Sequence, residues 1–191
     1  MPVTIPNRSF ESFQKIARVK GDLSCIITEK LDGTNAQIVI EDGKIVGVGS
    51  RSRWIAPGKE TDNFGFAGWV ERNEEDLLHL GDGVHFGEWY GSGIQRGYGL
   101  TNGEKRFALF NTGRWSAASA RPDCCGCVPV IYSGAYSQSA VDQVMKDLAT
   151  NGSHAVPGFM RPEGVVVYIP GTRSLLKATF EHSEGKWKEA A

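Results

Sequence analysis

The chain has 191 residues and a formal net charge of −1, so overall charge provides no attraction to a polyanion, and any nucleic acid must be held by a local patch. Hydrophobic residues make up 40% and charged residues 23%, which is typical of a globular protein and excludes a disordered or membrane-embedded chain. The length favours a single domain over residues 1–191. No signal peptide or membrane span is evident, so we expect a cytoplasmic protein without a membrane partner.

The hydrophobic pattern predicts short helices and strands in a mixed order. Apolar residues spaced three or four apart predict helices at residues 9–18, 66–80 and 138–149. Shorter apolar or alternating runs predict strands at residues 23–28, 36–40, 44–48, 84–90, 106–110, 128–132, 164–169 and 174–180. The pair Asp42-Gly43 predicts a β-hairpin between the second and third of these strands. Because strands and helices do not alternate regularly, we expect an α+β fold.

Three of the four cysteines, Cys124, Cys125 and Cys127, lie in one short segment, whereas Cys25 lies alone in a predicted strand. Cys124 and Cys127 have the Cys-x2-Cys spacing of a zinc site, but a zinc site also needs a second ligand pair, and the sequence provides no matching pair elsewhere. We therefore expect reduced thiols without a metal, with zinc binding and a disulfide as the alternatives.

Lys30 is the first candidate for chemistry, because it stands beside the carboxylates Glu29 and Asp32 where a predicted strand meets a turn. Such a lysine is ordinarily a solvated member of an ion pair. A lysine amine becomes a nucleophile only when it is neutral, which requires other cations or desolvation in the same pocket. The prediction of a catalytic lysine therefore depends on what other segments bring near Lys30.

Two basic stretches and two carboxylates are candidates to complete a phosphate site around Lys30. Arg51 follows the predicted hairpin and Lys177 lies in the last predicted strand, although basic residues on a strand usually just face water. Glu88 and Glu163 each stand beside a glycine in an apolar strand, where an unpaired carboxylate would be costly. Mg²⁺ bridging phosphates is typically held by one or two carboxylates, which is the role that these two fit.

The ordered set of motifs resembles the signature of the covalent nucleotidyltransferases, the superfamily of DNA ligases, RNA ligases and mRNA capping enzymes. Lys30-Leu-Asp-Gly resembles the nucleophile motif, and the motifs that follow it are similar to those at Ser50-Arg51, Phe86-Gly-Glu88, Phe107 to Phe110, Glu163-Gly-Val-Val and Leu176-Lys177. Within the superfamily, Thr34-Asn35 resembles RNA-ligase-2-like enzymes and trypanosome editing ligases, because DNA ligases usually carry arginine at the second position.

The resemblance implies an ATP-dependent RNA ligase core that forms a lysyl-AMP intermediate at Lys30 and joins 5′-phosphate to 3′-hydroxyl ends. It implies two antiparallel sheets with flanking helices around an ATP pocket. It implies that Phe110 stacks on adenine and that Glu163 and Glu88 serve Mg²⁺ or Mn²⁺. It further implies nucleotide contacts from Glu29, Asn35, Arg51, Glu88 and Lys177. The implied partners are RNA ends, or a nicked duplex with RNA at the 3′-OH, and possible accessory nucleic-acid-binding proteins.

The sequence departs from the family pattern in two places. The fifth motif often has a second lysine where this chain has Thr179, so Arg173 or Lys186 would have to supply that charge. The chain also ends 14 residues after Lys177, which leaves no room for a C-terminal OB barrel and is similar to small bacteriophage ligase cores acting in the host cytoplasm.

Two alternatives remain open at this stage: an ATP-dependent DNA ligase core, which Asn35 argues against, and an inactive nucleotide- or nucleic-acid-binding relative. Without a second domain, RNA would have to be held by the surface around the pocket. The candidate phosphate contacts are Arg53, Arg96, Arg114 and the cluster at residues 186–188.

Overall fold

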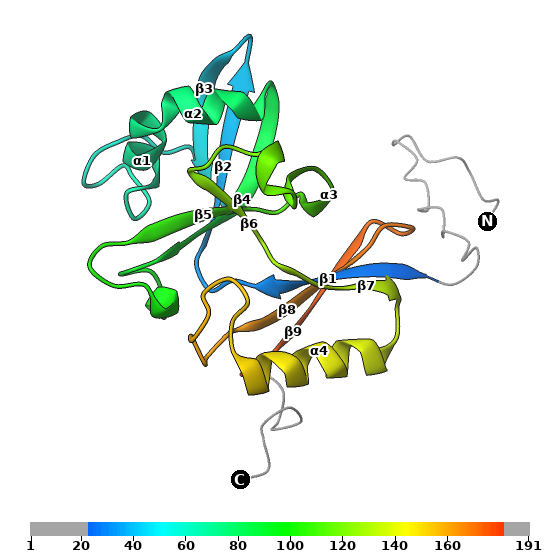
Figure 1. The fold of residues 1–191 in the computed structure, drawn as a ribbon. Helices are drawn as coiled ribbons and strands as arrows, with labels where there is room; N and C mark the ends of the chain where they lie inside the picture. Colours follow the sequence, from blue (N-terminus) through cyan, green and yellow to red (C-terminus); the bar gives the residue numbers. More distant parts are fainter. Residues whose placement is uncertain (1–22, 182–191) are drawn as a thin grey trace, which may run out of the picture.

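The computed structural model describes residues 23–181, and the helix predicted at residues 9–18 lies outside this range. Two β-sheets form the frame, as Figure 1 shows. Sheet A has the order β7-β1-β8-β9 and contains β1 (Ser24–Lys30), β7 (Val130–Ala135), β8 (Gly164–Ile169) and β9 (Ser174–Thr179). Sheet B has the order β3-β2-β4-β5-β6 and contains β2 (Thr34–Glu41), β3 (Lys44–Ser50), β4 (Gly83–Gly91), β5 (Lys105–Leu109) and β6 (Cys125–Cys127).

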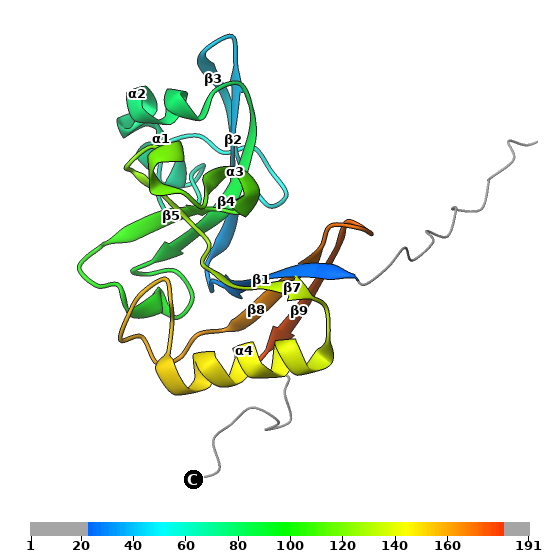
Figure 2. The ribbon, with the colours of Figure 1, turned by 45° about the vertical axis from the view of Figure 1, so that its right-hand side comes forward.

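Helix α4 (Gln138–Asn151) covers one face of sheet A, and Figure 2 shows it running along the side away from sheet B. Cys25 and Ile27 are alternate residues of β1, and they are buried in one cluster with Met145 and Leu148 of this helix. The helix begins at Ser137, whose Oγ accepts a hydrogen bond of 3.0 Å from the backbone N–H of Ala140. The predicted helix at residues 138–149 is therefore confirmed and extends two residues further.

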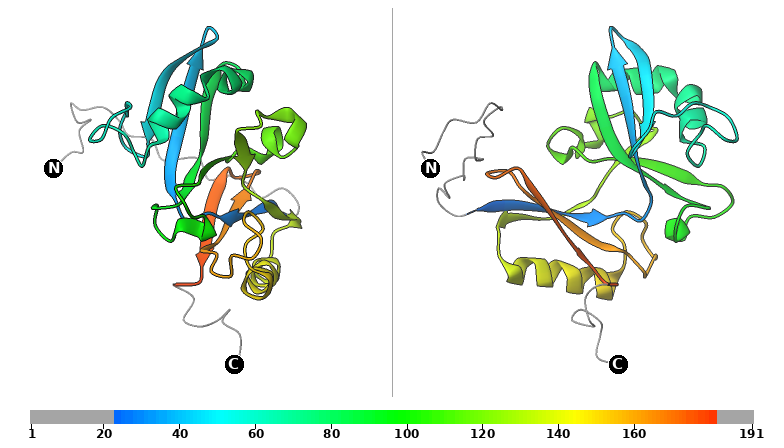
Figure 3. Two further views of the ribbon diagram at one scale, coloured as in Figure 1. Left: turned by 60° about the vertical axis from the view of Figure 1, so that its left-hand side comes forward. Right: turned by 180° about the vertical axis from the view of Figure 1, so that it is seen from behind.

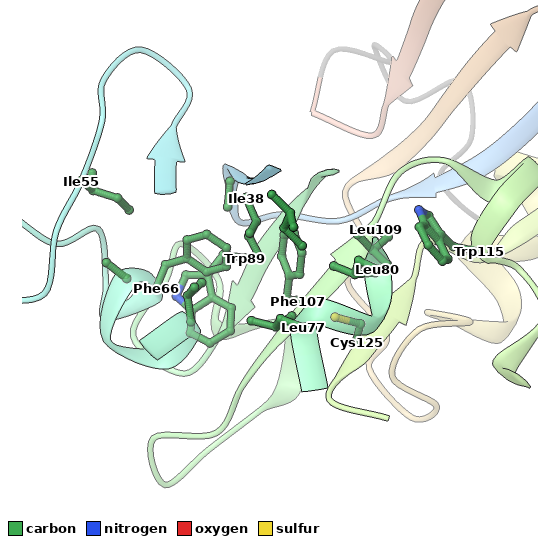
Figure 4. Packing of buried hydrophobic residues seen from close by; sticks show 14 of the residues in the cluster. Ile38, Ile55, Phe66, Leu77, Leu80, Trp89, Phe107, Leu109, Trp115 and Cys125 are labelled. Atoms are coloured by element: carbon green, nitrogen blue, oxygen red, sulfur yellow. The ribbon is translucent and has the colours of Figure 1, made fainter. Parts of the chain in front are cut away.

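Short helices cover one face of sheet B and bury the large cluster in Figure 4. They are α1 (Phe66–Arg72), α2 (Glu74–Leu77) and α3 (Thr112–Trp115), with 3-10 turns η1 (Leu78–Leu80), η2 (Gly97–Gly99) and η3 (Ala118–Ala120) nearby. Ile38 of β2 and Phe107 of β5 point into this cluster and are fully buried. Because side chains alternate along a strand, Gln37 and Phe86 point to the opposite face, which no helix within residues 23–181 covers.

A third cluster of buried residues connects the two sheets where the chain passes from β1 into β2. It contains Leu31 from this crossing, Tyr90 from β4 and Val128 from the segment that leads into β7. The two further views in Figure 3 show the sheets at opposite ends of the described structure, with this crossing between them. The expected α+β fold with two sheets and flanking helices is confirmed.

The structure corrects the sequence interpretation in three places. The predicted helix at residues 66–80 is broken at Asn73, whose side chain donates a hydrogen bond of 2.7 Å to the Trp69 carbonyl and competes with the helical pattern. The predicted strand at residues 128–132 begins only at Val130, as β7, because Pro129 has no N–H for a ladder, and the short strand β6 that precedes it was not predicted. Finally, β6 pairs with β5 in parallel, so sheet B is not wholly antiparallel. Parallel neighbours need a crossover connection, which runs here through α3 and η3.

Candidate active site

Lys30 is the last residue of β1, and its side chain forms an ion pair with Glu163. The backbone register places Lys30 opposite Gly164, the first residue of β8, so the preceding Glu163 comes within reach of the lysine. Lys30 Nζ donates to Glu163 Oε2 at 2.6 Å, in a partly buried setting. Gly164 has φ +147°, and a Cβ there would lie 2.0 Å from the Ala178 carbonyl oxygen of β9. Only glycine therefore allows this close packing beside Lys30.

The segment after Lys30 wraps around the carboxylate of Glu88. The backbone N–H of Gly33 donates to Glu88 Oε1 at 3.1 Å, and Asn35 Nδ2 donates to Glu88 Oε2 at 3.2 Å. Asn35 and Glu88 are direct partners in the β2–β4 ladder. A Cβ on Gly33 would lie 2.4 Å from the carbonyl oxygen of Trp89, so the turn needs glycine to pass so close to β4.

Glu88 is only 8% exposed, and the pKa of its carboxyl group is raised to about 7, with burial as the largest cause. The positive charge of Lys30 and the hydrogen bond from Gly33 act in the opposite direction and lower the pKa. The negative charges of Glu163 and Asp32 raise it further. The charges of Lys30, Glu163 and Asp32 therefore all influence the pKa of Glu88. A cation that binds beside these carboxylates would favour the ionised form of Glu88.

A pocket of about 230 Å³ lies on the face of sheet B that no described helix covers. Phe110, Arg51 and Asn35 line it together with Ala36, Gln37, Ser50 and Phe86. Phe110 directly follows β5 and is 40% exposed, whereas Phe107 is fully buried in the core. The two phenylalanines of this motif thus have different roles, and only Phe110 offers a ring face to a ligand.

Lys177 lies in β9 on the same face of sheet A as Lys30, but not in the same cross-strand row. Its partner is Val166, whose partner in β1 is Thr28. The row that contains Lys30 continues instead through Gly164 to Thr179, which is 8% exposed. The cross-strand row of Lys30 therefore contains Thr179, and Lys177 lies two residues before it in β9, in the next row on the same face.

Glu29, which was also expected to contact nucleotide, points away from Lys30, because successive side chains of a strand face opposite sides. Its carboxylate is 1% exposed and accepts hydrogen bonds of 2.9 Å from the backbone N–H groups of His154 and Ala155. It also accepts a hydrogen bond from the Tyr98 hydroxyl. Glu29 therefore anchors two loops beside the nucleophile strand, and its nucleotide contact stays a prediction. No sequence signal pointed to Tyr98 or to residues 154–155.

The arginines expected to contact phosphate differ in the ion pairs and hydrogen bonds that they form within the protein. Arg96 forms ion pairs with Asp32, at 3.2 Å, and with Glu181. Arg114 donates a hydrogen bond of 2.6 Å to the Leu80 carbonyl. Arg53 is exposed and makes one long hydrogen bond, of 3.4 Å, to a backbone carbonyl. The cluster at residues 186–188 lies outside the described range, so Arg53 is the described candidate best placed for a ligand.

All four cysteines are free thiols, with the Sγ atoms of Cys124 and Cys125 3.9 Å apart, and burial raises the pKa of Cys127. Within residues 23–181, no group of three or more His, Cys, Asp or Glu side chains is placed to hold a metal ion. In the same range, no helix is both long and apolar enough to cross a bilayer.

The two sheets, with a lysine at the end of β1 and carboxylates from β4 and the start of β8 around it, define the nucleotidyltransferase fold. A family model described as RNA ligase matches residues 23–187, and the chain belongs to the RNA ligase family. No match was found among curated proteins.

Solved structures of Naegleria gruberi RNA ligase have the same fold. A variant with AMP and Mn is 19% identical with a TM-score of 0.61, and the match covers 83% of this chain and 50% of that one. A variant with ATP and Mn is 20% identical with a TM-score of 0.59, and covers 85% and 52%. This chain therefore spans about half the length of these solved relatives.

Proposed function

We propose that the chain is an ATP-dependent RNA ligase core in which residues 1–191 act as one nucleotidyltransferase domain. The observation that carries the proposal is the position of the Lys30 amine, 2.6 Å from the Glu163 carboxylate and within the electrostatic reach of Glu88. Membership of the RNA ligase family supports it, as do the ATP and AMP in the solved Naegleria relatives. The pocket beside Phe110 offers a ring for stacking and the guanidinium group of Arg51 for a phosphate or sugar, which fits a nucleotide.

The reaction would proceed in three displacements at phosphorus. The Lys30 amine attacks the α-phosphate of ATP, a P–N bond forms and pyrophosphate leaves. The 5′-phosphate of an RNA end then takes the AMP from Lys30. The 3′-hydroxyl of a second end finally attacks the activated phosphate, and AMP leaves. Positioning and electrostatic stabilisation would supply most of the rate.

The carboxylates fit a hard divalent cation, Mg²⁺ or Mn²⁺, as the Mn in the solved relatives suggests. Glu163 and Glu88 offer oxygen ligands, and no described cluster of three or more ligating side chains encloses a metal. That combination suits an ion held by one or two carboxylates together with phosphates and water. When bound, the ion would neutralise charge on the transferred phosphoryl group.

The side chains of this chain would divide the remaining work. The Lys30 amine can attack only in its neutral form, and Glu163 accepts a hydrogen bond of 2.6 Å from it, so this carboxylate is placed to take the proton. Phe110 would stack on adenine, and Arg51, which lines the same pocket, would contact the sugar or phosphates. Asn35 would hold Glu88 in position, and Lys177 would reach the α-phosphate from sheet A.

Finer features of the function belong to the same proposal. RNA ends, or nicked duplexes with RNA at the 3′-OH, would be the substrates, in RNA repair in the cytoplasm. If the protein comes from a bacteriophage, the repair would take place in the host cytoplasm. An accessory nucleic-acid-binding partner would help to hold the RNA. Asn35 stands where DNA ligases usually carry arginine, and this resemblance supports RNA over DNA as the substrate.

The test is labelling with ATP radioactive at the α-phosphate, followed by denaturation. Wild-type protein should keep the label, whereas Lys30→Ala and Lys30→Arg should lose it, because arginine remains protonated. Lys146→Ala, on the exposed side of α4, is the matched control and should be labelled normally. Label retained by Lys30→Ala would refute the assignment. Sealing of an all-DNA nick faster than one with RNA at the 3′-OH would refute the RNA preference alone.

A further inference from the structure

The uncovered face of sheet B carries a band of exposed apolar side chains, which we call the aromatic face. Phe86 of β4 pairs with Gln37 of β2, and Gln37 pairs with Gly49 of β3, so these positions share the side opposite to the buried core. On this side Phe86 is 53% exposed and Phe110 is 40% exposed. Val84, two residues before Phe86 in β4, lies on the same side and is also exposed, as is Trp54. Several large exposed apolar side chains on one face of a sheet are typical of an interaction site.

Trp54 is held on the aromatic face by the backbone. The chain folds back after β3, so that the Ser50 N–H donates to the Arg53 carbonyl and the Ile55 N–H donates to the Val48 carbonyl, each at 2.9 Å. Trp54 itself forms a bridge with Gly49. A Cβ added to Gly47 would lie 3.0 Å from the Trp54 ring, so the ring lies directly over this glycine. The indole is thus positioned on the sheet, yet it stays 65% exposed.

Basic residues flank the exposed tryptophan. Arg51 and Arg53 are both exposed, and Arg51 also lines the pocket next to Phe86 and Phe110. Asp82, which accepts hydrogen bonds from the β2–β3 turn, lies at the opposite end of the sheet from the pocket. The aromatic face is therefore basic where it meets the pocket. Stacking rings beside guanidinium groups fit a single-stranded polynucleotide better than an apolar protein partner.

We propose that the aromatic face is the track along which an RNA strand reaches the active site, with Trp54 stacking on a base beyond the nucleotide pocket. Arg53 contacts a backbone phosphate of the same strand. This assignment rests on the proposed ligase function. It gives the chain a strand-binding surface despite its net charge of −1, because the contacts are local.

The test measures binding of a fluorescent single-stranded RNA by anisotropy, alongside ATP labelling of the same preparations. Trp54→Ala should weaken RNA affinity by about 5- to 10-fold, while Trp54→Phe should retain most of it. Arg53→Ala should lower the slope of log affinity against log salt by about 1. Met160→Ala, which removes an apolar side chain that is 53% exposed elsewhere, is the control and should bind RNA as wild type does.

Labelling separates the two proposals. Wild-type protein that takes no label contradicts the ligase function, whereas normal labelling with unchanged RNA affinity in Trp54→Ala contradicts the RNA track. Photo-crosslinking of a 4-thiouridine RNA to the wild-type protein gives a second measurement that does not depend on a folded variant. A crosslink at Trp54 supports the proposal, and crosslinks confined to other surfaces overturn it. A dimer that Trp54→Ala disrupts, with RNA affinity unchanged, would show the face to be a protein interface instead.

Discussion

Replacing Glu88 by glutamine should change how the free energy of unfolding depends on pH. In the native protein the pKa of Glu88 is raised from 4.5 to about 7, mainly by burial. Between these values the folded state binds more protons than the unfolded state, so stability decreases as pH rises. A shift of this size corresponds to about 3 kcal/mol in total, of which about 2–3 kcal/mol is lost between pH 5 and pH 8.

The assay is urea unfolding of wild-type protein and Glu88→Gln at several pH values from 5 to 8, without nucleotide or metal. Glutamine keeps the shape of the side chain, and its oxygen can still accept from the Gly33 N–H, while Asn35 can turn its amide to accept from the new NH₂ group. Other titrating groups are common to both proteins and cancel in the difference. Wild type should therefore lose about 2–3 kcal/mol relative to the variant as pH rises. Parallel pH profiles for the two proteins would refute the reasoning that burial dominates at Glu88.

Two further predictions concern the aromatic motif and the thiol segment. Phe107→Ala should destabilise the fold by about 3–5 kcal/mol in urea unfolding, because its ring is fully buried. Phe110→Ala should change stability by less than about 0.5 kcal/mol but weaken labelling at limiting ATP. A large loss of stability in Phe110→Ala, with weakened labelling in a stable Phe107→Ala, would show instead that Phe110 packs in the core and Phe107 contacts the nucleotide. Elemental analysis of purified protein should find no stoichiometric zinc at Cys124 and Cys127, whereas about one zinc per chain would contradict this.

Local patterns in the sequence were sufficient to predict most of the elements. The Asp42-Gly43 turn predicted the hairpin of β2 and β3, and the apolar spacing after Ser137 predicted α4. These predictions are confirmed because the preferences of a tight turn and of an amphipathic helix act between residues close in the chain. The order of the motifs also predicted the fold that the solved relatives share.

The tertiary structure decided which of these groups meet. Lys30 and Glu163 are 133 positions apart, and only the β1–β8 register brings them to 2.6 Å. The same register turns Glu29 inward, because strand neighbours face opposite sides and a shift of one residue would exchange them. Nothing local in the sequence specifies that register. It follows from burying the apolar face of each strand, which is a property of the whole fold.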